Sequence, residues 1–414
     1  KESMNDVIVV GGGASGLCAA IAAKKAGASD VVVLEKNTEF GKKLLATGNG
    51  RCNFTNLRIE KDCYHSDDID RVMQVISTFD QAEVLDFMCS VGLGIEYKNG
   101  WCYPRSMSAY SVQQAILSHA RKVGVSLKGG KEVRDIKKNG DTFQVLVDGY
   151  TYESKKVILA CGGYADPKSG STGEGFYILK RAGVHIKKPL PALVPLVIKD
   201  NPLQKAAGVR VNAKVSLMLN DREVESDTGN LQITEYGISG IPVFQISSDA
   251  VRALDEGKSV NVKIDFFPDY PSNAVKSLLE QCVTEASQNL DPSDPDKLLL
   301  MGIFPDKLAE VFSDMASPDD LTIGDVDAYT IAYFVDKIIN DLVLEVSGHK
   351  GFENAQTTSG GVTFDELNDD LSLKKVPGLY ICGEEVDADG LCGGYNLQWA
   401  FSSGHLAGKS AAEA

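Results

Sequence analysis

A glycine-rich turn near the start of the chain restricts the possible folds more than any other feature. The stretch VIVVGGGASG sets a β-branched apolar run at residues 7–10 before Gly11, Gly13 and Gly16, which have the spacing G-x-G-x-x-G. Apolar residues then recur at helical spacing until Gly27, which is placed to end a helix in the left-handed conformation. The order strand, turn, helix predicts that the chain opens with a Rossmann-like α/β unit.

This turn predicts a dinucleotide site. The first glycine permits a tight turn, the second lets the backbone approach a pyrophosphate, the third packs helix on strand, and the helix N-terminus attracts the anion. A second apolar strand at residues 31–34 is followed by Glu35, 19 residues after Gly16, where a carboxylate can bind ribose hydroxyls and disfavours a 2′-phosphate. NAD and FAD both contain the ADP half held here, so the pattern does not distinguish them. The candidate contacts are Gly11, Gly13, Ala14, Ser15, Gly16, Glu35 and Lys36.

The loop TGNGRCN follows at residues 47–53. Its cysteine, Cys52, has no second cysteine within the next five residues, which disfavours a disulfide reductase. Glycines, two asparagines and Arg51 can approach or hydrogen-bond a ligand closely. A surface turn with positive φ at Asn-Gly and a solvated Arg51 is the alternative that these residues leave open.

Two later strands also run into small residues. KKVILACGGYADP places Ala160, Cys161 and Gly162 where a cofactor could pass close to the backbone. GSTGEGFYILKRAG then predicts a helix with a capping box from Ser171 to Glu174.

Near the C-terminus, PGLYICGEE predicts a short strand that ends at Gly383 and Glu384. GGYNLQWAFSSGHLAG has small residues followed by apolar residues at helical spacing, which predicts a helix that starts near Tyr395. The N-terminus of that helix would point at the ligand.

These motifs together resemble the BaiN-like flavoproteins, also described as aminoacetone oxidase family FAD-binding enzymes, in the group of flavoproteins with two dinucleotide-binding domains. The resemblance covers essentially the whole chain and is carried by GGGASG, GKKLLATGNGRCNFTN, ACGGYADPKSGSTGEG, EYGISGIPVFQISS, TTSGGV and GLYICGEEVDADGLCGGYNLQWAFSSGHLAG. It implies bound FAD, with the loop at residues 47–53 at the flavin end and the helix from Tyr395 facing the pyrimidine edge. Glu384 or Asp387 would bind the ribityl chain, although neighbouring acids here could equally form a solvated loop. The implied positions are Gly48, Asn49, Arg51, Cys52, Asn53, Ala160, Cys161, Gly162, Gly383, Glu384, Asp387, Gly394, Tyr395, Asn396 and Leu397.

Cofactor motifs at both ends of the chain predict a discontinuous FAD-binding domain of Rossmann-like α/β fold, residues 1–188 and 351–414. Apolar and polar residues alternate in the first part of the insertion, which predicts an antiparallel, barrel-like β subdomain at residues 189–268. Apolar spacing of three and four residues then predicts a helical subdomain at residues 269–350.

Charge and cysteine usage restrict the partners. The 42 Lys and Arg residues against 57 Asp and Glu give a net charge of −15 and no basic stripe, which disfavours nucleic acid. The first apolar run is interrupted by glycines, so we expect neither a membrane span nor a signal peptide, and no metal-ligand cluster is visible. Scattered cysteines favour a reducing, cytoplasmic location. The oligomeric state is not indicated.

The sequence thus predicts an FAD-dependent oxidoreductase that transfers a hydride through flavin N5 to or from a small organic substrate, with NADH or NADPH as a transient co-substrate. The resemblance implies enones such as steroid-like bile acid intermediates, or amines, as substrate classes. Arg51 and the helix N-terminus at Tyr395 are candidates for stabilising developing negative charge. An oxygen-using amine oxidase and a non-enzymatic flavin-binding module, such as an RNA-modification partner, are the alternatives.

Overall fold

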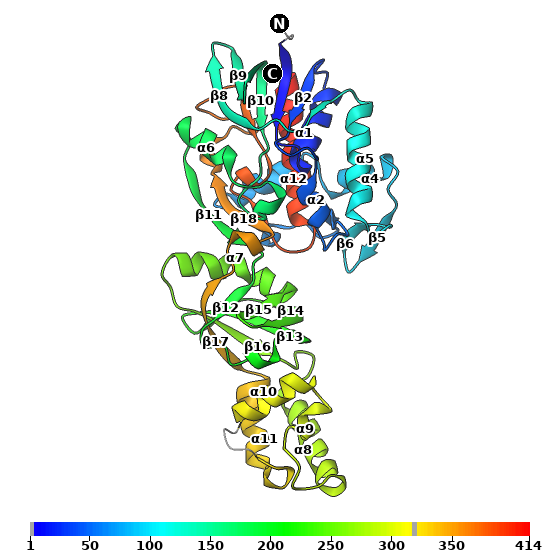
Figure 1. Ribbon diagram of the computed structural model, residues 1–414, viewed down its shortest axis with the longest axis vertical. Coiled ribbons are helices and arrows are strands. Elements are labelled where there is room, and N and C mark those ends of the chain that lie inside the picture. The colour runs from blue at the N-terminus through cyan, green and yellow to red at the C-terminus, as the bar shows by residue number, and fades with distance from the viewer. Residues whose placement is uncertain (1–3, 317–320) are drawn as a thin grey trace. The chain divides into compact units, whose positions relative to one another are not determined.

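The computed structural model describes residues 4–316 and 321–414 and divides into two compact units (Figure 1). The first unit comprises Lys1–Ala192 and Ala355–Ala414, and the second comprises Leu193–Asn354. The expected architecture of a Rossmann-like domain with an inserted β-barrel and helices is confirmed. In the described residues, no helix is both long and apolar enough to cross a membrane.

A seven-stranded sheet forms the centre of the first unit, in the order β7-β2-β1-β10-β9-β8 with β19 also pairing with β10. Strands β1 and β2 are parallel and buried on both faces, as their β-branched sequences favour. Helices α1 and α12 lie side by side against this sheet (Figure 1). They approach so closely that a Cβ at Gly408 would lie 2.0 Å from the Ala19 carbonyl oxygen. The start and the end of the chain therefore share one core.

The elements of the first unit follow. Its strands are β1 (Asn5–Val10), β2 (Val31–Leu34), β3 (Thr55–Asn56), β4 (Tyr64–His65), β5 (Ile95–Lys98), β6 (Trp101–Pro104), β7 (Ser126–Lys128), β8 (Val133–Asn139), β9 (Thr142–Val147), β10 (Tyr150–Leu159), β11 (Ile186–Ala192), β18 (Thr357–Val362), β19 (Leu379–Ile381) and β20 (Asp389–Gly390). Its helices are α1 (Ala14–Lys25), α2 (Lys42–Ala46), α3 (Ile69–Ile76), α4 (Gln81–Ser90), α5 (Ala109–Lys122), α6 (Glu174–Arg181) and α12 (Tyr395–Glu413).

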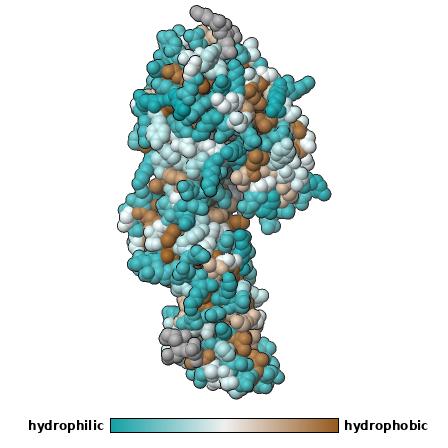
Figure 2. Space-filling view, in the orientation of Figure 1, coloured by the Kyte–Doolittle hydropathy of each residue, from teal (hydrophilic) through white to brown (hydrophobic). Residues whose placement is uncertain are grey.

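The second unit contains a closed antiparallel barrel in the order β12-β15-β14-β13-β16-β17. Along β16 (Val260–Asp265), the buried residues Val260, Val262 and Ile264 alternate with less buried ones. The barrel strands are β12 (Leu196–Ile198), β13 (Arg210–Leu219), β14 (Arg222–Thr234), β15 (Gly237–Gly240), β16 (Val260–Asp265) and β17 (Leu342–His349). The helices of this unit are α7 (Ile241–Asp255), α8 (Ser272–Asn289), α9 (Leu298–Met301), α10 (Asp306–Ala316) and α11 (Ala328–Phe334). The face of the protein shown in Figure 2 is mainly hydrophilic, with apolar residues scattered over it.

The insertion differs from the expected boundaries in two places. Helix α7 lies within the segment expected to be wholly β, and strand β17 lies within the segment expected to be helical. β17 alternates strictly between buried and exposed residues from Leu342 onward, a period of two that the apolar run before it obscures. Because β17 pairs with both β12 and β16, it closes the barrel.

Candidate functional site

A cavity in the first unit lies at the carboxyl ends of β1, β2 and β10, where ligands bind in open α/β sheets. It holds about 1210 Å³ of empty space, including the part that opens to solvent. The predicted residues that line it are Gly11, Gly13, Ala14, Ser15, Glu35, Lys36, Ala160, Cys161, Gly162, Gly383, Glu384, Asn396 and Leu397. Segments from both ends of the chain and from its middle therefore form one site.

The three glycines of the first turn have different surroundings. A Cβ at Gly11, where φ is +107°, would lie 2.1 Å from the Ala160 carbonyl oxygen, and one at Gly16 would lie 2.0 Å from the Gly11 carbonyl oxygen. A Cβ at Gly13 would meet no atom of the described residues within 4 Å. Gly11 and Gly16 thus allow the turn and α1 to pack, while Gly13 borders open space at the N-terminus of α1.

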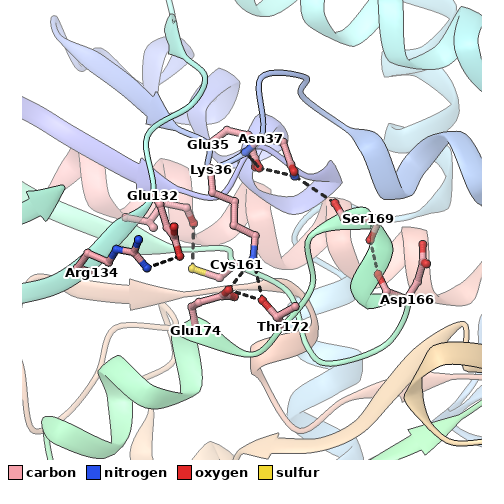
Figure 3. A network of polar contacts seen from close by, with 11 residues as sticks. Glu35, Lys36, Asn37, Glu132, Arg134, Cys161, Asp166, Ser169, Thr172 and Glu174 are labelled. Atoms are coloured by element: carbon pink, nitrogen blue, oxygen red, sulfur yellow. Dashed lines mark hydrogen bonds and ion pairs between the residues drawn. The ribbon is translucent and has the colours of Figure 1, made fainter. Parts of the chain in front are cut away.

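The Glu35 carboxylate holds this turn in place and also contacts Asn37, as Figure 3 shows for the latter pair. One oxygen accepts a hydrogen bond of 2.7 Å from the Gly12 amide, and the other accepts bonds of 2.9 Å from the amide and the side chain of Asn37. The Asn37 side chain also donates to the Ser169 carbonyl oxygen at 3.1 Å. Glu35 therefore organises two walls of the cavity in addition to lining it.

Lys36 makes a second cross-link at the cavity (Figure 3). Its Nζ lies 2.6 Å from Glu174 Oε1 and 2.8 Å from Thr172 Oγ1. Helix α6 begins at Glu174 after Gly173, with no side-chain cap, so the capping box expected from Ser171 to Glu174 does not form. The Lys36 ammonium orients Glu174 instead, and Glu174 itself lines the cavity.

The loop at residues 47–53 meets the cavity through Thr47 alone, and the predicted Gly48, Asn49, Arg51, Cys52 and Asn53 lie outside the lining. Arg51 is exposed, and its Nε donates to the Gly48 carbonyl oxygen at 3.0 Å. The guanidinium carbon lies 5.9 Å from the centre of the Tyr103 ring. The surface-turn reading therefore describes the position of Arg51 better than a side chain inserted among the cavity residues.

Two other residues of this loop are buried. Cys52 has a φ of +59°, and burial raises the pKa of its thiol to about 12, so the thiol stays protonated at neutral pH. Asn53 is buried, and neither atom of its side-chain amide has a hydrogen-bond partner within the described part of the chain. An unpartnered amide costs free energy unless a ligand satisfies it, so Asn53 is the loop residue that indicates a ligand.

In the C-terminal motif GGYNLQW, too, some of the predicted residues line the cavity and others do not. Helix α12 begins at Tyr395 as expected, and Asn396 and Leu397 in its first turn line the cavity, whereas Gly394 and Tyr395 do not. The Tyr395 ring is buried edge-on against Tyr64, with 5.8 Å between ring centres. Burial raises the pKa of the Tyr395 phenol well above its usual value, as does its contact with Cys63. Its phenol is thus a structural group, and the cavity is lined by later residues of α12, namely Asn396, Leu397 and Trp399.

The acids of the motif GEEVDADG are held by different partners. Glu384 forms an ion pair with Lys43 at the cavity, and its second oxygen is buried without a partner in the described residues. Asp387 lies outside the lining; it accepts hydrogen bonds from Lys187 at 3.3 Å and from the Asp67 amide at 3.1 Å. The acids therefore do not form a solvated loop.

Three residues at or beside the cavity were not predicted from the sequence. Lys43, which pairs with Glu384, lies in the GKK motif. Trp399 lines the cavity and its indole donates to the Gly383 carbonyl oxygen at 2.9 Å; its position three residues after Asn396 on α12 was the available signal. Glu385 is fully buried, and nothing in the local pattern separates it from its acidic neighbours.

These observations fit FAD. The open face at Gly13, the α1 N-terminus and the Glu35 carboxylate suit the ADP half, and the unpartnered oxygen of Glu384, which lines the cavity, suits a hydrogen-bond donor of the rest of the cofactor. The fold and site thus define a dinucleotide-binding Rossmann protein of the flavoprotein type.

A comparison with protein families supports the assignment to dinucleotide-binding Rossmann proteins. The model of the HI0933-like protein Rossmann domain matches residues 5–410. The chain belongs to the HI0933-like family, and it is an FAD-dependent oxidoreductase.

Two curated proteins and one solved structure are similar to this chain. It is 39% identical to the 3-dehydro-bile acid delta(4,6)-reductase of Clostridium scindens, over 99% of this chain and 100% of that protein. It is 28% identical to the ribosomal RNA dihydrouridine synthase of Escherichia coli, over 96% of each chain. The structure of 3-ketosteroid delta1-dehydrogenase from Sterolibacterium denitrificans matches with a TM-score of 0.51 and 14% identity over 99% of both chains, which shows a shared fold.

Proposed function

We propose that this protein is an FAD-dependent reductase that accepts electrons from NADH or NADPH and reduces a carbon–carbon double bond conjugated to a carbonyl group in a small, steroid-like or bile-acid-like substrate. The observation that carries the proposal is the 39% identity over the full length to a protein named as a bile acid delta(4,6)-reductase. We also propose a cytoplasmic location, which the nine free cysteines support.

The side chains of the site support a direct transfer without a protein thiol. FAD, when bound, supplies hydride transfer at its ring system. The turn at Gly13 and the α1 N-terminus would hold its anionic half, Glu35 its ribose, and the α12 end at Asn396 its ring. Cys52 is buried with a strongly raised thiol pKa, so it does not suit a disulfide relay.

Arg51 and the N-terminus of α12 at Tyr395 remain our candidates for stabilising negative charge that develops during reduction. Arg51 lies on the loop whose first residue, Thr47, lines the cavity. The Arg51 side chain is held on this loop because its Nε donates a hydrogen bond to the Gly48 carbonyl oxygen. Tyr395 would act through the helix end that it begins, since its phenol is buried elsewhere.

A ribosomal RNA substrate is the competing possibility, raised by the 28% identical dihydrouridine synthases. The second unit, residues 193–354, carries 13 Lys and Arg residues against 27 Asp and Glu. Such a charge balance repels a phosphate backbone, which carries one charge for every nucleotide, much more than a bile-acid-like molecule with a single carboxylate. We therefore favour a small-molecule substrate.

The deciding experiment follows the flavin absorbance bands, expected near 370 and 450 nm, after anaerobic addition of NADH and then NADPH. Bleaching by either nucleotide, followed by recovery on addition of a 3-oxo bile acid with 4,6-unsaturation, supports the proposal. Bleaching that only oxygen reverses would indicate an oxidase. A flavin spectrum that no donor or substrate changes would favour a binding module, and a protein that cannot be reconstituted with FAD would refute the assignment.

A further inference from the structure

Glu385 is a buried acid directly behind the wall of the cofactor cavity. It ends the 3-10 turn η8 (Gly383–Glu385), and its side chain has no exposed surface. Its Oε2 accepts a hydrogen bond of 2.9 Å from the backbone amide of Cys161, which lines the cavity. The carboxyl group therefore holds the backbone that the cofactor would contact.

The Glu385 carboxyl group is closely packed against helix α6. A Cβ at Gly175, in the first turn of α6, would lie 1.7 Å from Glu385 Oε1. That oxygen is buried and has no hydrogen-bond partner among the described residues. On the other side, the Cys161 thiol lies 3.6 Å from the carbonyl oxygen of Val10, the residue before the Gly11 turn. Glu385 thus contacts Cys161, and Cys161 in turn contacts the residue that precedes the turn that would bind the pyrophosphate.

Burial is the main factor that opposes ionisation of Glu385. Two acids lie near it, Glu174 on α6 and Glu384 on η8, but each forms an ion pair with a lysine, Lys36 and Lys43 respectively. The thiols of Cys161 and Cys382 are the other titratable groups beside it, and Glu35 and Lys36 act on Cys161 from the cavity side. The elements packed on η8 present uncharged side chains there: Thr, Ser, Gly and Val from β18, Ser15 from α1, and Trp399 and Ser403 from α12. Burial, with a smaller contribution from Glu174 and Glu384, raises the pKa of Glu385 to about 8.

We propose that Glu385 is a proton-linked positioning residue of the FAD site, neutral while FAD is bound and ionised when FAD leaves at alkaline pH. A neutral carboxyl group accepts the Cys161 hydrogen bond without placing charge near the anionic cofactor. A carboxylate at the same point would repel that cofactor, so FAD binding and proton binding at Glu385 favour each other. This inference goes beyond the proposed reductase activity and depends only on FAD binding.

The test measures the FAD dissociation constant of the apoprotein by flavin fluorescence between about pH 6.5 and 9. For the natural chain, we expect the constant to rise by about five- to tenfold across this range, the low end of coupling between two sites. Glu385→Gln keeps the shape and an acceptor for Cys161 but cannot ionise, so its profile should be flat. Glu366→Gln, which removes a carboxylate paired with Lys375 at 3.0 Å outside the cavity, is the matched control and should follow the natural chain.

Proton uptake gives a readout that does not require the variant to fold. Calorimetry of FAD binding near pH 8 in two buffers of different ionisation enthalpy should show net uptake of protons by the natural chain and by Glu366→Gln. An equal rise of the dissociation constant in Glu385→Gln, or no proton uptake by the natural chain, would overturn the proposal. Failure of FAD to bind at any pH would instead refute the FAD assignment itself.

Discussion

The two units differ sharply in charge although they are parts of one chain. The first unit carries 29 Lys and Arg residues against 30 Asp and Glu, while the second carries 13 against 27. Almost the whole net charge of −15 therefore belongs to the inserted unit. In the first unit, bases such as Lys36 and Lys43 pair with acids at the cavity and limit the repulsion of an anionic cofactor.

The net charge of the whole chain does not describe the charge of each unit. The overall acidity disfavours nucleic acid, but it describes the insertion and not the cofactor site. A near-neutral unit can bind a dinucleotide through a few amides and a helix end, which the net charge of the chain conceals. Four experiments test whether cofactor binding belongs to the first unit and is independent of the acidic insertion.

The largest effect is expected at the glycine turn. Gly11→Ala would place a Cβ against the Ala160 carbonyl oxygen, and we expect FAD affinity to fall by about a hundredfold or more, because the turn must open. The ratio of flavin to protein absorbance after purification measures this. The matched control is Gly27→Ala, which has nearly the same φ of +106° but no atom of the described residues within 4 Å. It should retain FAD and cost only about 1–2 kcal/mol of stability.

A second test uses the pH dependence of stability. Because the pKa of Glu385 is raised to about 8 in the folded protein, the unfolded chain loses this proton first as pH rises. The free energy of unfolding should therefore fall between about pH 4.5 and 8 and level off above that range. Denaturant melts of the apoprotein at pH 5 and 8 should show about 3–4 kcal/mol more loss in the natural chain than in Glu385→Gln. If the free energy of unfolding falls equally in the natural chain and in Glu385→Gln, the pKa of Glu385 is not raised in the folded protein.

The third test concerns Arg51. Arg51→Ala should slow substrate reduction by about tenfold, as expected for loss of one charge-stabilising group, while FAD affinity changes less than about twofold. Stopped-flow absorbance separates these quantities. Arg105→Ala, which removes an exposed arginine paired with Glu96 at 3.0 Å, is the control. Equal rates in both variants would remove Arg51 from the mechanism.

The smallest effect is expected in the insertion. Replacing the exposed Glu280, Glu285 and Asp336 by their amides should leave FAD affinity within about twofold and stability within about 0.5 kcal/mol, because surface changes rarely cost more. Fluorescence titration and thermal melts measure both. A tenfold change in FAD affinity would contradict the assignment of cofactor binding to the first unit alone.

Local patterns predicted the parts of the fold in which sequence neighbours are also spatial neighbours. The turn at Gly11, the acid at Glu35 and the start of α12 at Tyr395 each depend on a few consecutive residues. Strand β17 was placed in the helical part because an apolar helix precedes it without a glycine or proline between them. Its role is set by pairing with β12 and β16, which lie far away in the sequence.

The class of fold, the dinucleotide turn and the family could be predicted from the amino-acid sequence alone, because glycine spacing, strand patterning and motif order are local features. Which polar side chains face the cavity could be seen only in the folded protein. Arg51 lies at the surface, Tyr395 is buried against Tyr64, and Glu385 lies beneath Cys161 although its neighbour Glu384 pairs with Lys43. Adjacent residues of one type can point in opposite directions, and their charge depends on burial and partners contributed by distant segments.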